Sequence, residues 1–121
     1  MSINESSTTT TNNTIVLITG GNTGIGLAIA QALLSAPIEP YSIIVTSRSI
    51  ERATAAIKGL YNDPTFKDAF SSGSEALPMQ LDVDDDESVK AVRQRIGEKF
   101  GRVDVLVNNA GTSLADLTTV P

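Results

Sequence analysis

The glycines between residues 19 and 26 are the residues whose spacing most clearly suits chemistry. The segment Thr19–Gly26 reads Thr-Gly-Gly-Asn-Thr-Gly-Ile-Gly and directly follows the apolar run Ile15–Ile18. Gly20 permits a tight turn, Gly24 lets the backbone approach a diphosphate, and Gly26 lets a following helix pack closely on the strand. Free N–H groups at the start of that helix would face the anion. The pattern predicts a phosphate-binding turn, although an isolated match is equally compatible with an ordinary turn.

Two shorter segments, each at the end of a later apolar run, are further candidates. They are Asp82-Val83 and Asn108-Asn109-Ala110-Gly111. Asp82 stands directly at the end of a predicted strand, where its carboxylate could accept a hydrogen bond from a ligand. The alternative is a loop or helix-capping carboxylate, because four acidic residues follow it at 84–87. Asn108 could equally be a side chain that ties two loops together.

The three segments together resemble the short-chain dehydrogenase/reductase family, over about residues 14–115. That family's turn is Thr-Gly-x-x-x-Gly-x-Gly, and Thr19–Gly26 match every fixed position. The resemblance implies that Asp82-Val83 binds adenine, and that the segment from Asn108 holds the sheet together and lies along the cofactor. The contacts it implies in these segments are Gly20, Asn22, Thr23, Gly24, Ile25, Gly26, Asp82, Val83, Asn108, Ala110 and Gly111.

The end of the second apolar run bears on which nicotinamide dinucleotide is bound. A carboxylate there would bind a ribose 2′-hydroxyl and repel a 2′-phosphate, but residues 45–50, at the end of this run, include no acid. Arg48 stands about 20 residues past the glycines, where the ribose is expected, and Ser47 could add a hydrogen bond. This resembles the NADP-preferring members of the family, so NADP(H) is predicted over NAD. Arg48 could instead be a surface arginine that begins a helix, and Thr23 stands where many NADP-preferring members carry a basic residue.

The elements that position these segments alternate between strands and helices. Such alternation predicts right-handed crossovers and a parallel sheet, here a partial Rossmann-type doubly wound α/β fold with about four strands and three helices. Residues 63–77 show no clear period and predict a long irregular loop. The predicted strands cover 15–18, 42–46, 78–81 and 103–107, and the predicted helices cover 24–35, 49 to about 60, and 84–100.

Composition describes one ordinary globular domain. The chain has 121 residues, of which 40% are hydrophobic and 19% charged, typical of a protein that folds in water. A net charge of −5 with no basic cluster argues against nucleic acid and anionic membranes as partners. The sequence contains no stretch of about 20 apolar residues, which is the length that a helix needs to span a bilayer. Residues 1–13 predict a disordered polar tail, and residues 14–121 predict the partial NAD(P)-binding domain. The tail has no signal-peptide pattern, which favours a cytosolic location.

The groups that would perform the family's chemistry are not found in the chain. Family members transfer hydride between a nicotinamide and a carbonyl or alcohol, with a Tyr-x-x-x-Lys pair and a Ser. Tyr41 and Tyr61 are followed four residues later by Val45 and Thr65, so neither matches. We therefore assign no catalytic and no metal-binding residue, and expect a chain that is inactive alone, such as a fragment or truncated product of a reductase. A non-catalytic dinucleotide-binding regulatory protein and a non-functional product are the alternatives.

The predicted fourth strand would be internal in the complete family fold, paired by a fifth. As an apolar edge over 103–107 it predicts self-association.

Overall fold

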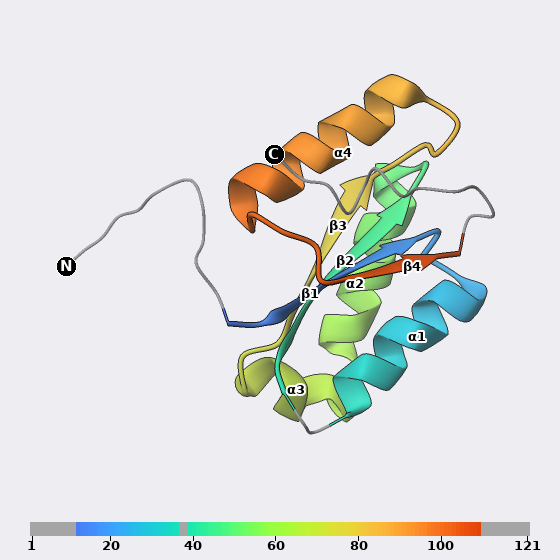
Figure 1. Ribbon diagram of the computed structural model, residues 1–121. Helices are drawn as coiled ribbons and strands as arrows, with labels where there is room; N and C mark the ends of the chain where they lie inside the picture. The colour runs from blue at the N-terminus through green and yellow to red at the C-terminus, as the bar shows by residue number, and fades with distance from the viewer. Residues whose placement is uncertain (1–11, 37–38, 110–121) are drawn as a thin grey trace.

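Four parallel strands form the centre of the molecule, as a computed structural model that describes residues 12–36 and 39–109 shows (Figure 1). The strands run side by side in the order β3-β2-β1-β4, so the first described strand lies inside the sheet and the last lies at one edge of it. This is the parallel α/β arrangement that the alternating pattern predicts. The strands are β1 (Thr14–Thr19), β2 (Tyr41–Ser47), β3 (Glu75–Gln80) and β4 (Val105–Asn108).

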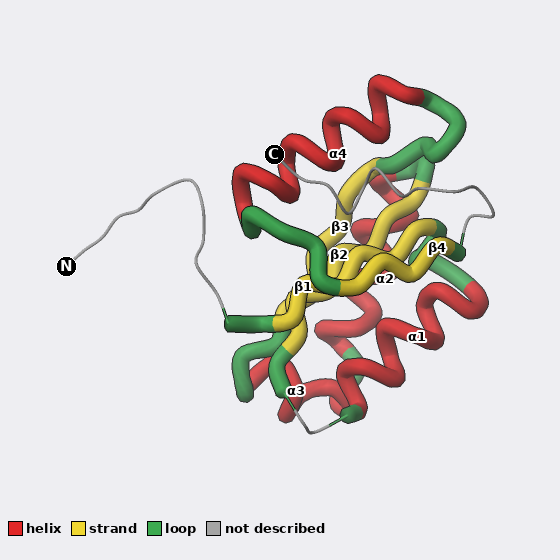
Figure 2. Tube along the Cα trace, viewed as in Figure 1, coloured by secondary structure: helices red, strands yellow, loops and turns green. Residues whose placement is uncertain are grey.

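Helices cover both faces of this sheet. One face carries α1 (Gly24–Ser35) and α2 (Ile50–Asn62), and the other carries α4 (Asp86–Lys99) (Figure 2). Because successive side chains of a strand point to opposite faces, Ile15 and Leu17 pack on the α4 side, whereas Val16 and Ile18 pack on the α1 and α2 side. Both layers are apolar, which explains why the strands are continuous apolar runs.

The helix boundaries follow local signals in the sequence. Ser49 caps α2 by accepting a hydrogen bond from the N–H of Arg52, and Asp85 caps α4 by accepting from the N–H of Glu87. Gly101, with φ of 79°, turns the chain out of α4. Among the described residues, no helix is long and apolar enough to cross a membrane.

The irregular loop predicted over residues 63–77 is wrong. The segment contains a 3-10 helix, η1 (Pro64–Phe66), a short helix, α3 (Lys67–Ser71), and the first half of β3. Phe66 is buried at 5% exposure, and the ring of Phe70 stacks on Tyr61 with centroids 4.0 Å apart. Two aromatic anchors therefore order a segment too short to show a helical period. The predicted fold had about three helices, and α3 is the one that it missed.

Two strands, β3 and β4, begin more than one residue away from their predicted starts. β3 begins at Glu75 rather than Pro78, and pairs with β2 along its length from Ser42 to Ser47. Proline is tolerated inside β3 because the strand lies at a sheet edge, where a missing N–H costs no ladder bond. β4 begins at Val105, two residues later than predicted.

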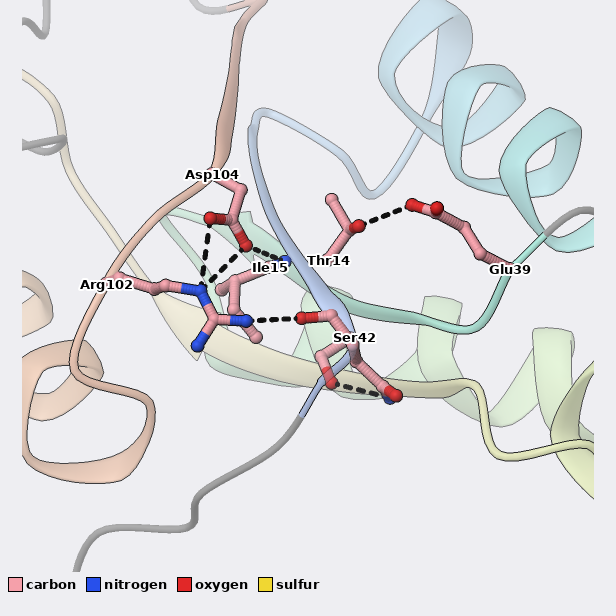
Figure 3. A network of polar contacts seen from close by, with 7 residues as sticks. Thr14, Ile15, Glu39, Ser42, Arg102 and Asp104 are labelled. Carbon is pink, nitrogen blue, oxygen red and sulfur yellow. Dashed lines mark hydrogen bonds and ion pairs between the residues drawn. The ribbon is translucent and has the colours of Figure 1, made fainter.

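A polar network replaces regular pairing before β4 and joins the amino ends of the strands (Figure 3). Asp104 Oδ2 accepts from the N–H of Ile15 at 2.7 Å and lies 3.0 Å from Arg102 Nε. Arg102 Nη2 donates to the carbonyl of Asn13 at 2.7 Å, and Asn13 Nδ2 donates to Ser42 Oγ at 3.2 Å. Asn13, the last residue of the predicted polar tail, therefore takes part in this network. The remainder of that tail, up to residue 11, lies outside the described residues.

Candidate functional site

The glycine-rich turn connects the carboxyl end of β1 to α1 and has the backbone that its glycines permit. Gly20 and Gly24 have φ of 63° and 58°, a left-handed region that residues with a Cβ rarely adopt. Gly26 has a different constraint. A Cβ on it would lie 2.7 Å from the carbonyl oxygen of Gly20 and 2.9 Å from Cα of Gly21. The helix therefore approaches the turn as closely as the backbone allows, as the sequence pattern predicts.

The amino end of α1 presents backbone donors rather than a side-chain cap. Thr23 occupies the N-cap position, and no side chain in the described segments caps this helix. Its first turn also carries no acidic residue, in contrast to the first turns of α2 and α4. The first N–H groups of an α-helix have no intrahelical partner, so those of Gly24, Ile25 and Gly26 suit an anion. Ile25 beside them is 72% exposed.

A groove of about 600 Å³ lies beside this turn. Three connections at the carboxyl ends of β1, β2 and β3 form its walls, and ligands of open α/β sheets bind at such ends. The groove brings together six of the residues predicted for the site, which are Gly20, Asn22, Thr23, Ser47, Arg48 and Val83. Its other lining residues are Ser49, Arg52, Leu81 and Asp84.

Two arginines line the groove, one in the β2–α2 connection and one at the start of α2. Arg48 precedes the helix, and its carbonyl accepts from Gln80 Nε2 at 3.0 Å, which holds this connection to β3. Arg52 lies in the first turn of α2. The sequence reasoning missed Arg52, although its spacing of four residues from Arg48 was a visible signal. Ser47 is buried, and its hydroxyl accepts from the N–H of Ser49 at 3.2 Å, so it shapes the turn before α2.

Asp82 takes part in a turn of its own loop. Its Oδ1 accepts from the N–H of Asp84 at 3.1 Å, and its N–H donates to Ser88 Oγ at 2.9 Å. Val83 and Asp84, rather than Asp82, line the groove. This arrangement corresponds to the loop-carboxylate alternative, and adenine binding by Asp82 stays a prediction.

The segment after β4 is tied to the glycine-rich turn. The N–H of Asn109 donates to Thr19 Oγ1 at 2.9 Å, and Asn109 Nδ2 donates to the carbonyl of Gly20 at 3.2 Å. Asn108 Oδ1 lies 3.5 Å from Thr19 Oγ1. Asn109 is a second residue that the predicted site omitted, although it belongs to the same motif. Ala110 and Gly111 lie outside the described residues.

The tyrosines have structural positions away from this groove. Tyr61 Oη accepts from the N–H of Ala76 at 3.1 Å, and its ring stacks on Phe70. Tyr41 is the first residue of β2, at the opposite end of the strand from Arg48. Neither lines the groove.

This chain is similar to known proteins in both sequence and structure. The family model described as short chain dehydrogenase matches residues 14–120. A short-chain dehydrogenase of Penicillium roqueforti, anuI, is 41% identical over 97 residues, which are 80% of this chain and 34% of that protein. Among solved structures, menthone neomenthol reductase from Mentha piperita is 34% identical with a TM-score of 0.69, covering 84% of this chain and 33% of the other.

L-sorbose reductase from Gluconobacter frateurii, solved with NADPH and L-sorbose, is 34% identical with a TM-score of 0.65, covering 83% of this chain and 34% of that one. Several other similar structures are complexes with NADP or NADPH.

The chain therefore has the amino-terminal part of a dinucleotide-binding α/β fold. It belongs to the short-chain dehydrogenase/reductase family. It spans about a third of the length of the curated relatives and solved structures it matches.

Proposed function

We propose that this chain is the NADP(H)-binding portion of a carbonyl or alcohol oxidoreductase. The observation that carries the proposal is the groove, which has an uncapped helix terminus at one side and two arginines at another. Anions are stabilised at such helix termini by unpaired N–H groups and by the helix dipole. The diphosphate would lie over Gly24, Ile25 and Gly26.

Arg48 and Arg52 support the choice of the phosphorylated coenzyme. Guanidinium groups form charge-assisted, often bidentate, hydrogen bonds with phosphate oxygens. No acidic residue lines the groove on the β2–α2 connection, so nothing on that wall would repel a 2′-phosphate. Solved relatives bound to NADPH agree with this assignment. Val83, with Asp82 beside it, would receive the adenine at the third wall.

The coenzyme, when bound, supplies the hydride that is exchanged with a carbonyl or alcohol carbon. The residues of this chain bind and orient it, and none is assigned a role in proton transfer. The hydroxyl of Tyr61 is hydrogen-bonded to the backbone of β3, and Tyr41 lies at the end of β2 opposite to the groove. We therefore propose that this chain binds the coenzyme and does not turn over a substrate by itself.

Titration with NADPH and NADH tests the proposal. The chain has no tryptophan, so the emission of the reduced coenzyme can be followed without overlap. Wild type should bind NADPH more tightly than NADH. A hydrogen bond to a charged group contributes about 1.5–3 kcal/mol, so Arg48→Ala should weaken NADPH binding by about 10- to 150-fold and leave NADH binding nearly unchanged.

Lys58→Ala is the matched control. Lys58 is an exposed residue of α2 outside the groove, so the variant loses the same unit of charge without changing the site. Its affinity for NADPH should stay close to that of wild type. Equal wild-type affinities for the two coenzymes would refute the role given to Arg48, and an equal loss in Lys58→Ala would reduce that role to bulk electrostatics.

A further inference from the structure

The chain crosses from β2 to α2 in two residues, Arg48 and Ser49. β2 ends at Ser47 and α2 begins at Ile50, and this short connection forms one wall of the groove. Arg48 is exposed, so its guanidinium stands on a long side chain that is not held by burial. The region that the guanidinium can reach therefore depends on how the backbone beneath it is fixed.

The peptide group between Arg48 and Ser49 is held at both of its polar atoms. Its carbonyl oxygen accepts a hydrogen bond from Gln80 Nε2 at 3.0 Å, and its N–H donates to Ser47 Oγ at 3.2 Å. The carbonyl and the N–H of a trans peptide point in opposite directions, so the two bonds together resist rotation of the peptide plane. That plane determines the direction in which the chain leaves Arg48.

Gln80 reaches this peptide because of the register between β2 and β3. It is the last residue of β3 and pairs with Ser47, the residue before Arg48. The N–H of the next residue, Leu81, donates to the carbonyl of Ser47 at 2.8 Å and continues the pairing by one step. Gln80 is exposed and is not among the residues that line the groove, so we expect no contact between it and the coenzyme.

Arg52, the second arginine of the groove, is held in a different way. It lies in the first turn of α2, and its N–H donates to Ser49 Oγ at 3.3 Å. Its backbone is therefore part of a capped helix, which does not depend on Gln80. Among the residues that the structure describes, Arg48 is the arginine of this groove whose backbone is bonded to a side chain of β3.

We propose that Gln80 is a positioning residue for coenzyme selectivity, which acts by holding the carbonyl of Arg48 and so keeping the guanidinium at the wall of the groove. This inference rests on the role proposed above for Arg48. A guanidinium bonds a phosphate oxygen only at about 3 Å, and a backbone that is fixed beforehand loses less entropy when that bond forms. NADH has no 2′-phosphate, so its binding should not depend on Gln80.

Gln80→Met tests the proposal, because methionine has nearly the length of glutamine but no hydrogen-bond donor. The lost bond is an exposed one, so NADPH binding should weaken by about two- to fivefold, while NADH binding stays unchanged. Gln94→Met is the matched control. Gln94 is an exposed glutamine of α4 whose Nε2 donates to Glu98 Oε2 at 3.2 Å, outside the groove. This control loses a similar bond and should bind both coenzymes as wild type does.

A double-mutant cycle separates positioning from a general structural effect. Gln80→Met should weaken NADPH binding in wild type but not in Arg48→Ala, because the guanidinium that Gln80 positions is then absent. Four results would overturn the proposal and leave the role of Arg48 in place: no loss in Gln80→Met, an equal loss for NADH, an equal loss in Gln94→Met, or the same loss in the Arg48→Ala background. If Arg48→Ala itself left NADPH binding unchanged, the role of Arg48 would be refuted, and the role of Gln80 with it.

Discussion

Gly26→Ala should destabilise the chain, although alanine is the better helix former. The added Cβ would lie 2.7 Å from the Gly20 carbonyl oxygen, 2.9 Å from Gly21 Cα and 3.0 Å from Asn109 Nδ2. Two of these neighbours are backbone atoms of the turn, so they cannot move without shifting the turn itself. Overpacking of this kind costs about 1–3 kcal/mol, which exceeds the roughly 0.5–1 kcal/mol that alanine gains over glycine in a helix.

Gly59→Ala is the matched control for this substitution. Gly59 lies inside α2, and a Cβ on it would meet nothing within 4 Å. The same chemical change should therefore stabilise the chain by about 0.5–1 kcal/mol. Because both variants share the helix gain, they should differ in stability by the overpacking cost of roughly 1–3 kcal/mol, with opposite signs relative to wild type.

Urea unfolding at one fixed protein concentration measures both effects, since self-association would make stability depend on concentration. The midpoint should fall for Gly26→Ala and rise for Gly59→Ala, with similar slopes. NADPH affinity should fall in Gly26→Ala alone, because the turn proposed to hold the diphosphate would have shifted. If Gly26→Ala were as stable as Gly59→Ala, the close approach of α1 to the turn would be refuted.

Three further predictions follow from single contacts. Asp104→Asn weakens the hydrogen bond from the N–H of Ile15 and should lower the free energy of unfolding by about 1 kcal/mol. Urea titration measures this change. An unchanged free energy of unfolding would show that the network does not hold β4. Phe66→Ala should cost about 3–4 kcal/mol in the same titration, because it empties a buried site beneath α3, and a cost below about 1 kcal/mol would contradict that anchor. The backbone and side-chain hydrogen bonds from Thr65 hold the pKa of Asp63 below its ordinary value. This contribution is present above the unfolded-state pKa of about 4 and is lost as the pH falls through the lower folded pKa. Asp63→Asn should flatten that part of the acid limb of stability against pH, and an unchanged limb would exclude the contribution.

Much of the fold is predictable from the sequence because strong local signals coincide there with tertiary packing. The buried strands, the cap at Ser49 and the stop at Gly101 all lie where the residue types place them. The segment over 63–77 was not predictable in this way. Its order comes from Phe66 and Phe70, whose partners are distant in the sequence or lie in another element, and no short-range period reports such contacts.

In the site, too, features set by local residue type were predictable and features set by tertiary contacts were not. The positive φ values of Gly20 and Gly24 are dictated by residue type, so the glycine pattern predicts the turn. The side chains that line the groove depend on where three connections converge, and Arg52 enters it because α2 begins at Ile50, which places Arg52 in the first turn of the helix. Asp82 is the opposite of Arg52, because the sequence pattern predicts it in the site and yet it does not line the groove. Its carboxylate accepts a hydrogen bond from the N–H of Asp84, which directs it into its own loop.

The central claim, that the turn after β1 holds the diphosphate of NADP(H) and an arginine binds its 2′-phosphate, is tested most directly by a crystal structure of the chain with NADP⁺. Diphosphate oxygens should lie about 3 Å from the amide nitrogens at the start of α1, with the 2′-phosphate within the same distance of Arg48 or Arg52. A correctly folded chain whose groove stays empty at saturating NADP⁺, or that binds the coenzyme elsewhere, would contradict it.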